Sequence, residues 1–329
     1  MRANIAIMDI LRQEQSSQQP QQQQRQENGV LFFLMDSGGL FWSFSISIVF
    51  IQVVKPLVSP GDYFSRLFSF FLHFNLTLFR FRLTFRSEMS SVPVLHVVSP
   101  LVHSIPMTHS LSTITSNTNV KVWVKLDCVQ PGGSFKIRGI GHLAQQAKAS
   151  GCTKLCSSSG GNAGMATAYA ASVIGGMTAT VVVPSTTPQF ARDKIESLGA
   201  EVVVHGNVWD QADAHVKEMV KELGEDNACY VPPFEHPTIW EGHASMIDEI
   251  KIQMNGKIPS CIVVSVGGGG LLLGVLVGLK RNGWESVPVI AVETLGAESF
   301  HKGMEAGKPV RLEGGITSVS IQAKRACIA

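Results

Sequence analysis

The sequence predicts an α/β protein in which parallel-rich sheets are flanked by helices. Short apolar runs typical of buried strands recur after residue 119, and stretches with helical spacing lie between them. Glycine-rich loops join several of these segments, and ligands of such folds gather in loops at the carboxyl ends of strands. Residues 1–88 hold 13 of the 17 Phe, whereas residues 89–329 hold 27 of the 31 Gly. We therefore expect the fold and the function in the second part.

The expected elements alternate along the chain. Val120 to Leu126 alternates apolar and polar side chains, as a half-buried strand does. The later strands are short and apolar throughout, which is typical of strands covered on both faces: 155–156, 179–183, 202–204, 261–266 and 289–292. Helical spacing predicts helices over 137–149, 163–173, 189–198, 209–223, 243–254 and 271–281.

Residues 1–88 resist a functional interpretation. Residues 12–29 contain nine glutamines, a polar tract that cannot bury enough apolar surface to order itself. Residues 37–54 carry no charge but alternate as a strand does, and the apolar run over 67–79 is too short to cross a membrane. We predict a disordered or non-native extension, with a membrane anchor and a transit segment as the alternatives.

Charge and cysteine content narrow the class of protein. The 27 Lys and Arg against 25 Asp and Glu leave a net charge of +2, so no nucleic-acid partner is expected. None of the six cysteines forms a Cys-x-x-Cys pair or lies at metal-ligand spacing from a histidine. Reduced cysteines and the absence of a secretory signal pattern predict a cytoplasmic protein that is not held at a membrane.

The first unusual loop runs from Pro131 to Gly139, between the first predicted strand and a helix. It places Lys136 in the first turn of that helix, where the positive end of the helix dipole favours a neutral amine. A neutral amine is the nucleophile that forms a Schiff base. The alternative is an ordinary solvated lysine beside a turn.

Two further loops favour anions. Ser157 to Gly164 offers backbone N–H groups at a helix N-terminus, where Asn162 either caps the helix or holds a ligand. Gly267 to Leu271 follows a buried strand, and its four glycines let the backbone wrap a phosphate; a plain tight turn is the alternative. This loop lacks the dinucleotide and Walker patterns, so a single phosphate is favoured. A Schiff-base lysine, a carboxylate loop and a one-phosphate loop fit an amino acid and pyridoxal phosphate.

The three loops, in this order and at this spacing, resemble the signature set of the serine dehydratase family of pyridoxal-phosphate enzymes, in its serine-dehydratase-like branch. The resemblance implies the two-domain fold type II architecture. Its large domain would comprise residues 89–133 and 237–329, and its small domain residues 134–236. Because the pattern breaks after Val319, the C-terminal part of the large domain is expected to be missing. A homodimer is expected if that part were complete.

The resemblance also implies the roles of individual residues. Lys136 would be the catalytic residue and would form the Schiff base with the cofactor, Phe135 would pack on the cofactor ring, and Asn162 would hydrogen-bond its 3′-oxygen. The cofactor phosphate would be bound by Gly267, Gly268, Gly269, Gly270 and Leu271. The substrate carboxylate would be bound by Ser159, Gly160, Asn162 and Ala163. A monovalent cation, usually potassium, would be coordinated at Glu293, Ala297 and Ser299.

The implied reaction is β-elimination of L-serine to pyruvate and ammonia, with L-threonine going to 2-oxobutanoate as a side activity. Ala163 and Gly164 after Asn162 differ from the Asn-His-Gly of serine-racemase-like enzymes, which argues against racemisation. Gly160 stands where the principal serine dehydratases have alanine, so weak turnover is expected. The alternative function is a truncated, catalytically impaired family member with weak or no cofactor binding.

Overall fold

The computed structural model describes residues 48–53, 94–103, 120–293, 296–308, 310, 312 and 325–327. The chain divides into two compact units. The four-strand unit consists of the described parts of residues 84–99 and 127–245, and the six-strand unit of those of 1–83, 100–126 and 246–329. The four-strand unit contains the predicted small domain, residues 134–236, together with flanking residues on both sides.

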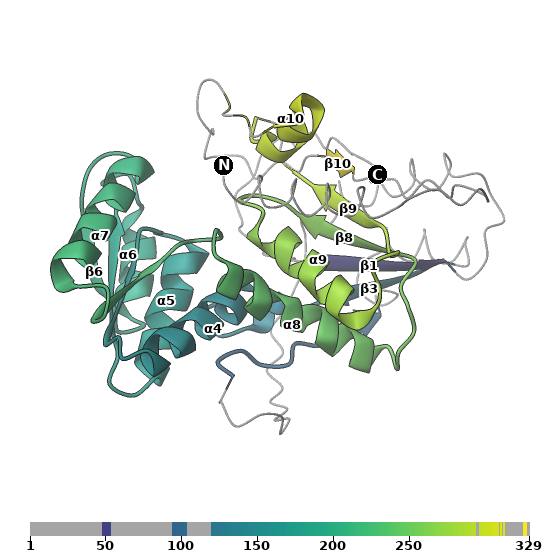
Figure 1. The fold of residues 1–329 in the computed structure, drawn as a ribbon, viewed down its shortest axis with the longest axis horizontal. Helices are drawn as coiled ribbons and strands as arrows, with labels where there is room; N and C mark the ends of the chain where they lie inside the picture. The colour runs from purple at the N-terminus through teal and green to yellow at the C-terminus, as the bar shows by residue number, and fades with distance from the viewer. Residues whose placement is uncertain are drawn as a thin grey trace. The chain divides into compact units, whose positions relative to one another are not determined.

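The four-strand unit contains a parallel sheet with the order β6-β5-β4-β7 among the described residues. Figure 1 labels its strand β6 and the helices around it. Helices connect successive strands, as parallel pairing requires. The strands are β4 (Lys154–Ser157), β5 (Thr178–Val183), β6 (Glu201–Val204) and β7 (Ala228–Val231). The helices are α4 (Lys136–Ala149), α5 (Asn162–Val173), α6 (Gln189–Glu196) and α7 (Trp209–Leu223). The α/β prediction is confirmed here, and β7 is the strand that sequence periodicity missed.

Both faces of this sheet are buried. Leu155 and Val181 pack into one core with side chains of α4 and α5, whereas Cys156 and Val182 pack into a second core with side chains of α7. Neighbouring residues of a strand point to opposite faces, so each strand contributes to both cores. Two-sided burial is the reason that apolar residues occupy neighbouring positions in these strands, as Leu155 and Cys156 do in β4.

The six-strand unit contains a mixed sheet with the order β10-β9-β8-β1-β3-β2 among the described residues. Within it, β8 and β9 pair in parallel, and the other described pairs are antiparallel. Its strands are β1 (Ile48–Val53), β2 (Leu101–His103), β3 (Val120–Lys125), β8 (Cys261–Ser265), β9 (Val289–Val292) and β10 (Arg325–Cys327). The helices are α9 (Gly270–Asn282), α10 (Ser299–Ala306) and α8 (Pro237–Gln253), whose residues 237–245 belong to the four-strand unit. A short 3-10 helix, η1 (Asp127–Val129), follows β3 along the chain.

The strand β1 lies between β8 and β3 and pairs with both. This differs from the disorder expected for residues 1–88, and it agrees with the strand-like alternation of residues 37–54. The glutamine-rich tract over 12–29 and the apolar run over 67–79 lie outside the described residues. Within the described ranges, no helix has both the length and the apolar character needed to cross a membrane.

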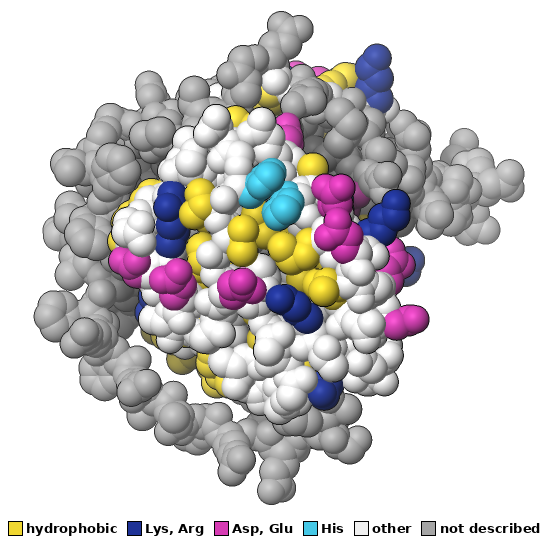
Figure 2. Space-filling view, turned by 90° about the vertical axis from the view of Figure 1, so that its left-hand side faces the viewer, with side chains coloured by type: hydrophobic (Ala, Val, Ile, Leu, Met, Phe, Trp, Pro, Cys, Tyr) yellow, Lys and Arg dark blue, Asp and Glu magenta, His cyan; other side chains and the backbone are white. Residues whose placement is uncertain are grey.

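One face of the four-strand unit carries charges of both signs around two adjoining histidines and hydrophobic side chains (Figure 2). His205, which follows β6, and His215 of α7 stack with ring centroids 4.1 Å apart. Val204 and Val208 are exposed nearby in the sequence. Basic and acidic side chains are interspersed on this face, so its described part offers no continuous basic surface of the kind that binds polyphosphates.

Candidate active site

Lys136 is the first residue of α4 in the four-strand unit. Its Nζ donates a hydrogen bond to the carbonyl of Pro233 and lies 5.2 Å and 5.9 Å from the ring centroids of Phe135 and Phe234. Burial of the amine lowers the pKa of Lys136 to about 8. A lowered pKa was expected from the helix dipole, but desolvation of the amine is the cause of the lower pKa in the structure.

A pKa of about 8 makes the reactivity of Lys136 depend on pH in a defined way. The amine of an ordinary lysine has a pKa of about 10.4. Only the neutral form of an amine is acylated. In the cofactor-free protein, we expect labelling of Lys136 by a small acylating reagent to reach half its maximum near pH 8. Peptide mass spectrometry across a pH series measures this. A midpoint at the ordinary lysine value would contradict the burial of the amine.

A buried ion pair fixes the turn of α4 that carries Lys136. The side chains of Arg138 and Asp127 are fully buried, with Nε 2.7 Å from Oδ2 and Nη2 2.9 Å from Oδ1. The Ser99 hydroxyl donates to Asp127 Oδ1 at 2.6 Å, and the Ser245 hydroxyl accepts from Arg138 Nη1 at 3.1 Å. Sequence reasoning missed this pair, although an arginine in an apolar helical stretch indicates a buried carboxylate partner.

Close packing of α4 against the first part of α8 supports Phe135. A Cβ on Gly242 would lie 2.7 Å from Gly139 Cα, so the two helices meet at a pair of glycines. His243 is fully buried there, and its ring lies edge-on to that of Phe135 with centroids 5.0 Å apart. Burial holds the pKa of His243 well below its usual value, which keeps the ring neutral. Sequence reasoning missed His243 because nothing in its helical context distinguishes it.

The serine-rich loop after β4 has an anchored half and an exposed half. Ser157 and Ser158 are fully buried, and their hydroxyls donate to the Val231 carbonyl at 3.2 Å and to Asp213 Oδ1 at 2.6 Å. Residues 159–162 are half-buried or exposed. Asn162 is the first residue of α5, and the N-cap position is Gly161, so the capping alternative for Asn162 does not hold. The predicted carboxylate loop therefore lies at a helix N-terminus, where an anion is favoured.

Gly164 holds this loop close to α5. A Cβ at Gly164 would lie 1.9 Å from the carbonyl oxygen of Ser159, so Gly164→Ala must move the backbone. We expect this variant to lose about 1–3 kcal/mol of unfolding free energy in urea titrations. Gly161→Ala is the matched control, because its Cβ would meet no atom closer than 4.0 Å. Equal stability of the two variants would contradict the loop conformation.

The glycine-rich loop of the six-strand unit connects β8 to α9. Gly269 is the N-cap of α9 and has a φ of +84°, a conformation that favours glycine. Among the residues that the structure describes, none has an atom within 4 Å of a Cβ built on Gly267, and Gly268 is half-buried. Gly270 and Leu271 form the first turn of α9. This backbone can accept one phosphate group at a helix N-terminus.

The residues predicted to hold a cation follow β9. Glu293 is buried, and its carboxylate accepts hydrogen bonds from the backbone N–H groups of Phe300 at 2.9 Å and His301 at 2.7 Å. The carbonyl of Ala297 accepts from the N–H of Ser299 at 3.0 Å. Glu293 therefore stabilises the start of α10. In the part of the chain that the structure describes, no cluster of three or more His, Cys, Asp or Glu side chains could hold a metal ion.

The structure distributes the predicted site residues over both units. Lys136, Phe135 and residues 159–163 belong to the four-strand unit, where α4 and α5 pack side by side. Gly267 to Leu271 belong to the six-strand unit, as do Glu293, Ala297 and Ser299. The four-strand unit thus carries the predicted Schiff-base lysine and substrate-carboxylate residues, and the six-strand unit carries the predicted phosphate and cation residues.

The chain belongs to the pyridoxal-phosphate-dependent enzymes, because the family model with that description matches residues 98–324. It is 42% identical over 237 residues to the L-serine dehydratase of Dictyostelium discoideum, covering 69% of this chain and 66% of the relative. It is 47% identical over 225 residues to the serine dehydratase-like protein of Homo sapiens, covering 68% and 64%. The predicted family resemblance is therefore confirmed.

Solved structures agree with this assignment. The crystal structure of a fungal L-serine ammonia-lyase from Rhizomucor miehei matches with a TM-score of 0.59 and 34% identity, over 70% of each chain. Maize serine racemase, at 23% identity and a TM-score of 0.56, shows the shared fold alone. The predicted fold type II architecture is confirmed. The chain spans about two thirds of the length of the curated relatives that it matches.

Proposed function

We propose that the protein catalyses the β-elimination of L-serine to pyruvate and ammonia and that it also accepts L-threonine, which would give 2-oxobutanoate. The observation that carries this proposal is the position of Lys136 at the start of α4, where its Nζ donates to the carbonyl of Pro233 and desolvation lowers its pKa to about 8. Relatives that bear the names L-serine dehydratase and L-threonine deaminase support the substrate class.

The residues present fit pyridoxal phosphate, since the glycine-rich backbone at the start of α9 can take its phosphate and the amine of Lys136, whose pKa desolvation lowers, can take its aldehyde. When bound, the cofactor supplies an electron sink for the charge that develops at the substrate Cα. Lys136 would hold the cofactor and move the Cα proton, and Phe135 would pack on the cofactor ring. Gly267 to Leu271 would bind the phosphate, and Asn162 would orient the ring oxygen. Ser159, Gly160, Asn162 and Ala163 would hold the substrate carboxylate.

Three finer features belong to the same proposal. Potassium would bind at Glu293, Ala297 and Ser299, where a buried carboxylate follows a strand. Five cysteines are free thiols, which favours a reducing, cytoplasmic setting: Cys128, Cys152, Cys156, Cys229 and Cys261. A homodimer would be the assembled form of a chain with a complete large domain.

A coupled assay for pyruvate tests the proposal on the full chain with saturating pyridoxal phosphate. We expect pyruvate and an equal amount of ammonia from L-serine. L-alanine is the matched control substrate, because it lacks the β-hydroxyl that must leave. An absence of pyruvate from L-serine would contradict the proposal and would favour the catalytically impaired family member.

A further inference from the structure

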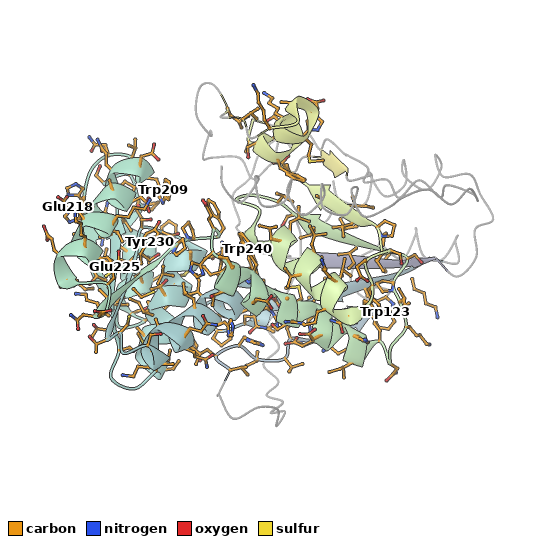
Figure 3. The ribbon with its side chains drawn as sticks, viewed as in Figure 1. Trp123, Trp209, Glu218, Glu225, Tyr230 and Trp240 are labelled. Atoms are coloured by element: carbon orange, nitrogen blue, oxygen red, sulfur yellow. The ribbon has the colours of Figure 1, made fainter. Side chains whose placement is uncertain are left out.

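The buried carboxylate of Asp213 accepts a hydrogen bond from the predicted substrate loop, and it is none of the residues proposed to contact the cofactor or the substrate. Asp213 of α7 accepts hydrogen bonds at Oδ1 from two hydroxyls, that of Ser158 at 2.6 Å and that of Tyr230 at 2.6 Å. Its Oδ2 lies 2.5 Å from Nζ of Lys217, one helical turn further along α7. Asp213 of α7 is therefore hydrogen-bonded both to β7, through Tyr230, and to the loop after β4, through Ser158. Tyr230 is labelled in Figure 3.

The protonation states of Asp213 and Tyr230 keep the hydrogen bonds of this cluster in place. Burial alone would raise the pKa of Asp213, but the hydrogen bonds from Lys217, Ser158 and Tyr230 outweigh burial and lower it. Burial and the neighbouring Asp213 raise the pKa of Tyr230. The carboxylate thus stays an acceptor and the phenol stays a donor at physiological pH. Charged acceptors make stronger hydrogen bonds than neutral ones.

The hydrogen bond from Ser158 to Asp213 fixes the chain directly before the predicted substrate-binding residues. Ser158 directly precedes the residues that would bind the substrate carboxylate, Ser159 to Ala163, and it is fully buried. A backbone site for an anion works only when its N–H groups are fixed before the ligand arrives. A shift at Ser158 would be passed along the chain to the neighbouring amides.

We propose that Asp213 is a positioning residue for substrate binding, which clamps Ser158 and Tyr230 so that the loop over 159–163 is set to receive the carboxylate of L-serine. This inference rests on the proposed function. It identifies a residue outside the three motif loops that determines how well the substrate binds.

Three variants of the full chain test this role. Asp213→Ala removes the acceptor for both hydroxyls, whereas Asp213→Asn keeps an amide oxygen that still accepts from them. We expect Asp213→Ala to raise KM for L-serine about tenfold while kcat stays within about twofold, because substrate and transition state lose the same contact. We expect Asp213→Asn to restore KM to within about threefold of wild type. Glu218→Gln, an exposed carboxylate on the same helix, is the control with no effect on KM (Figure 3).

Hydrogen exchange on the cofactor-free protein gives a readout that needs no turnover. We expect amides of residues 158–163 to exchange about tenfold faster in Asp213→Ala than in wild type, and near the wild-type rate in Asp213→Asn. If wild type forms no pyruvate, the proposed function fails, and the exchange measurement still decides whether the clamp exists. Should Asp213→Ala fail to fold, Tyr230→Phe replaces it, with KM and exchange each raised about threefold.

Unchanged KM and unchanged exchange in folded Asp213→Ala would overturn the inference. A fall in kcat with KM unchanged would overturn it as well, because a clamp for substrate binding acts on KM. An Asp213→Asn variant as impaired as Asp213→Ala would show that charge, and not the hydroxyl clamp, is what matters.

Discussion

Lys136→Ala should abolish the formation of pyruvate from L-serine. The variant loses the amine that would hold the cofactor and also the base that would move the Cα proton. Loss of a general base alone typically lowers turnover about 10²–10⁴-fold, and loss of covalent attachment adds to this. The glycine-rich loop lies in the other unit and should keep its conformation. Single-turnover and steady-state pyruvate assays at saturating cofactor measure the loss.

The matched control is Lys194→Ala, which removes an exposed lysine of α6 in the same unit. Its turnover should equal that of wild type. Pyruvate formation by Lys136→Ala at more than about a hundredth of the wild-type rate would show that another group performs the chemistry. The three motif loops would then have to serve a different ligand.

The second large effect concerns the buried ion pair that supports α4. Asp127→Ala should lower the free energy of unfolding by about 3–5 kcal/mol, because it leaves the Arg138 guanidinium buried without its carboxylate. Domains are typically stable by about 5–15 kcal/mol, so much of the stability would be lost. Urea unfolding followed by fluorescence measures the change.

An exposed ion pair provides the comparison for this prediction. Arg281 pairs with Asp248 on the surface, where the two side chains are 42% and 39% exposed. Exposed pairs contribute about 0–1 kcal/mol, so Arg281→Ala should change stability little. Similar losses in both variants would mean that burial of the Asp127–Arg138 pair does not determine its contribution.

Most strands and helices after residue 119 could be predicted because their patterns are local, but β7, α10 and β10 were not. Predicted strands such as 179–183 and 289–292 agree closely with β5 and β9. The predicted start of α8 was residue 243, six residues later than its observed start at Pro237. Proline is common in the first turn of a helix, but it does not contribute to the apolar spacing by which helices were predicted. The strand β7 was missed: only Val231 of its four residues is β-branched, whereas three of the four residues of β9 are.

Individual site residues could be proposed from the sequence where a motif contains them, as for Lys136, whose role remains a prediction. The groups that hold those residues in place were not predictable, because they come together only in the folded chain. Ser158 and Asp213 are 55 residues apart, and Asp127 and Arg138 lie in different elements. Sequence periodicity carries no information on such pairs, which depend on which helices pack against which strands.

Borohydride reduction of the full chain loaded with pyridoxal phosphate, followed by peptide mapping, tests the assignment of Lys136 most directly. Reduction makes the bond between a lysine and the cofactor permanent, so mass spectrometry can locate it. We expect one modified peptide, carrying the cofactor on Lys136, and no such peptide in Lys136→Ala. Modification spread over exposed lysines, with Lys136 unmodified, would contradict the assignment.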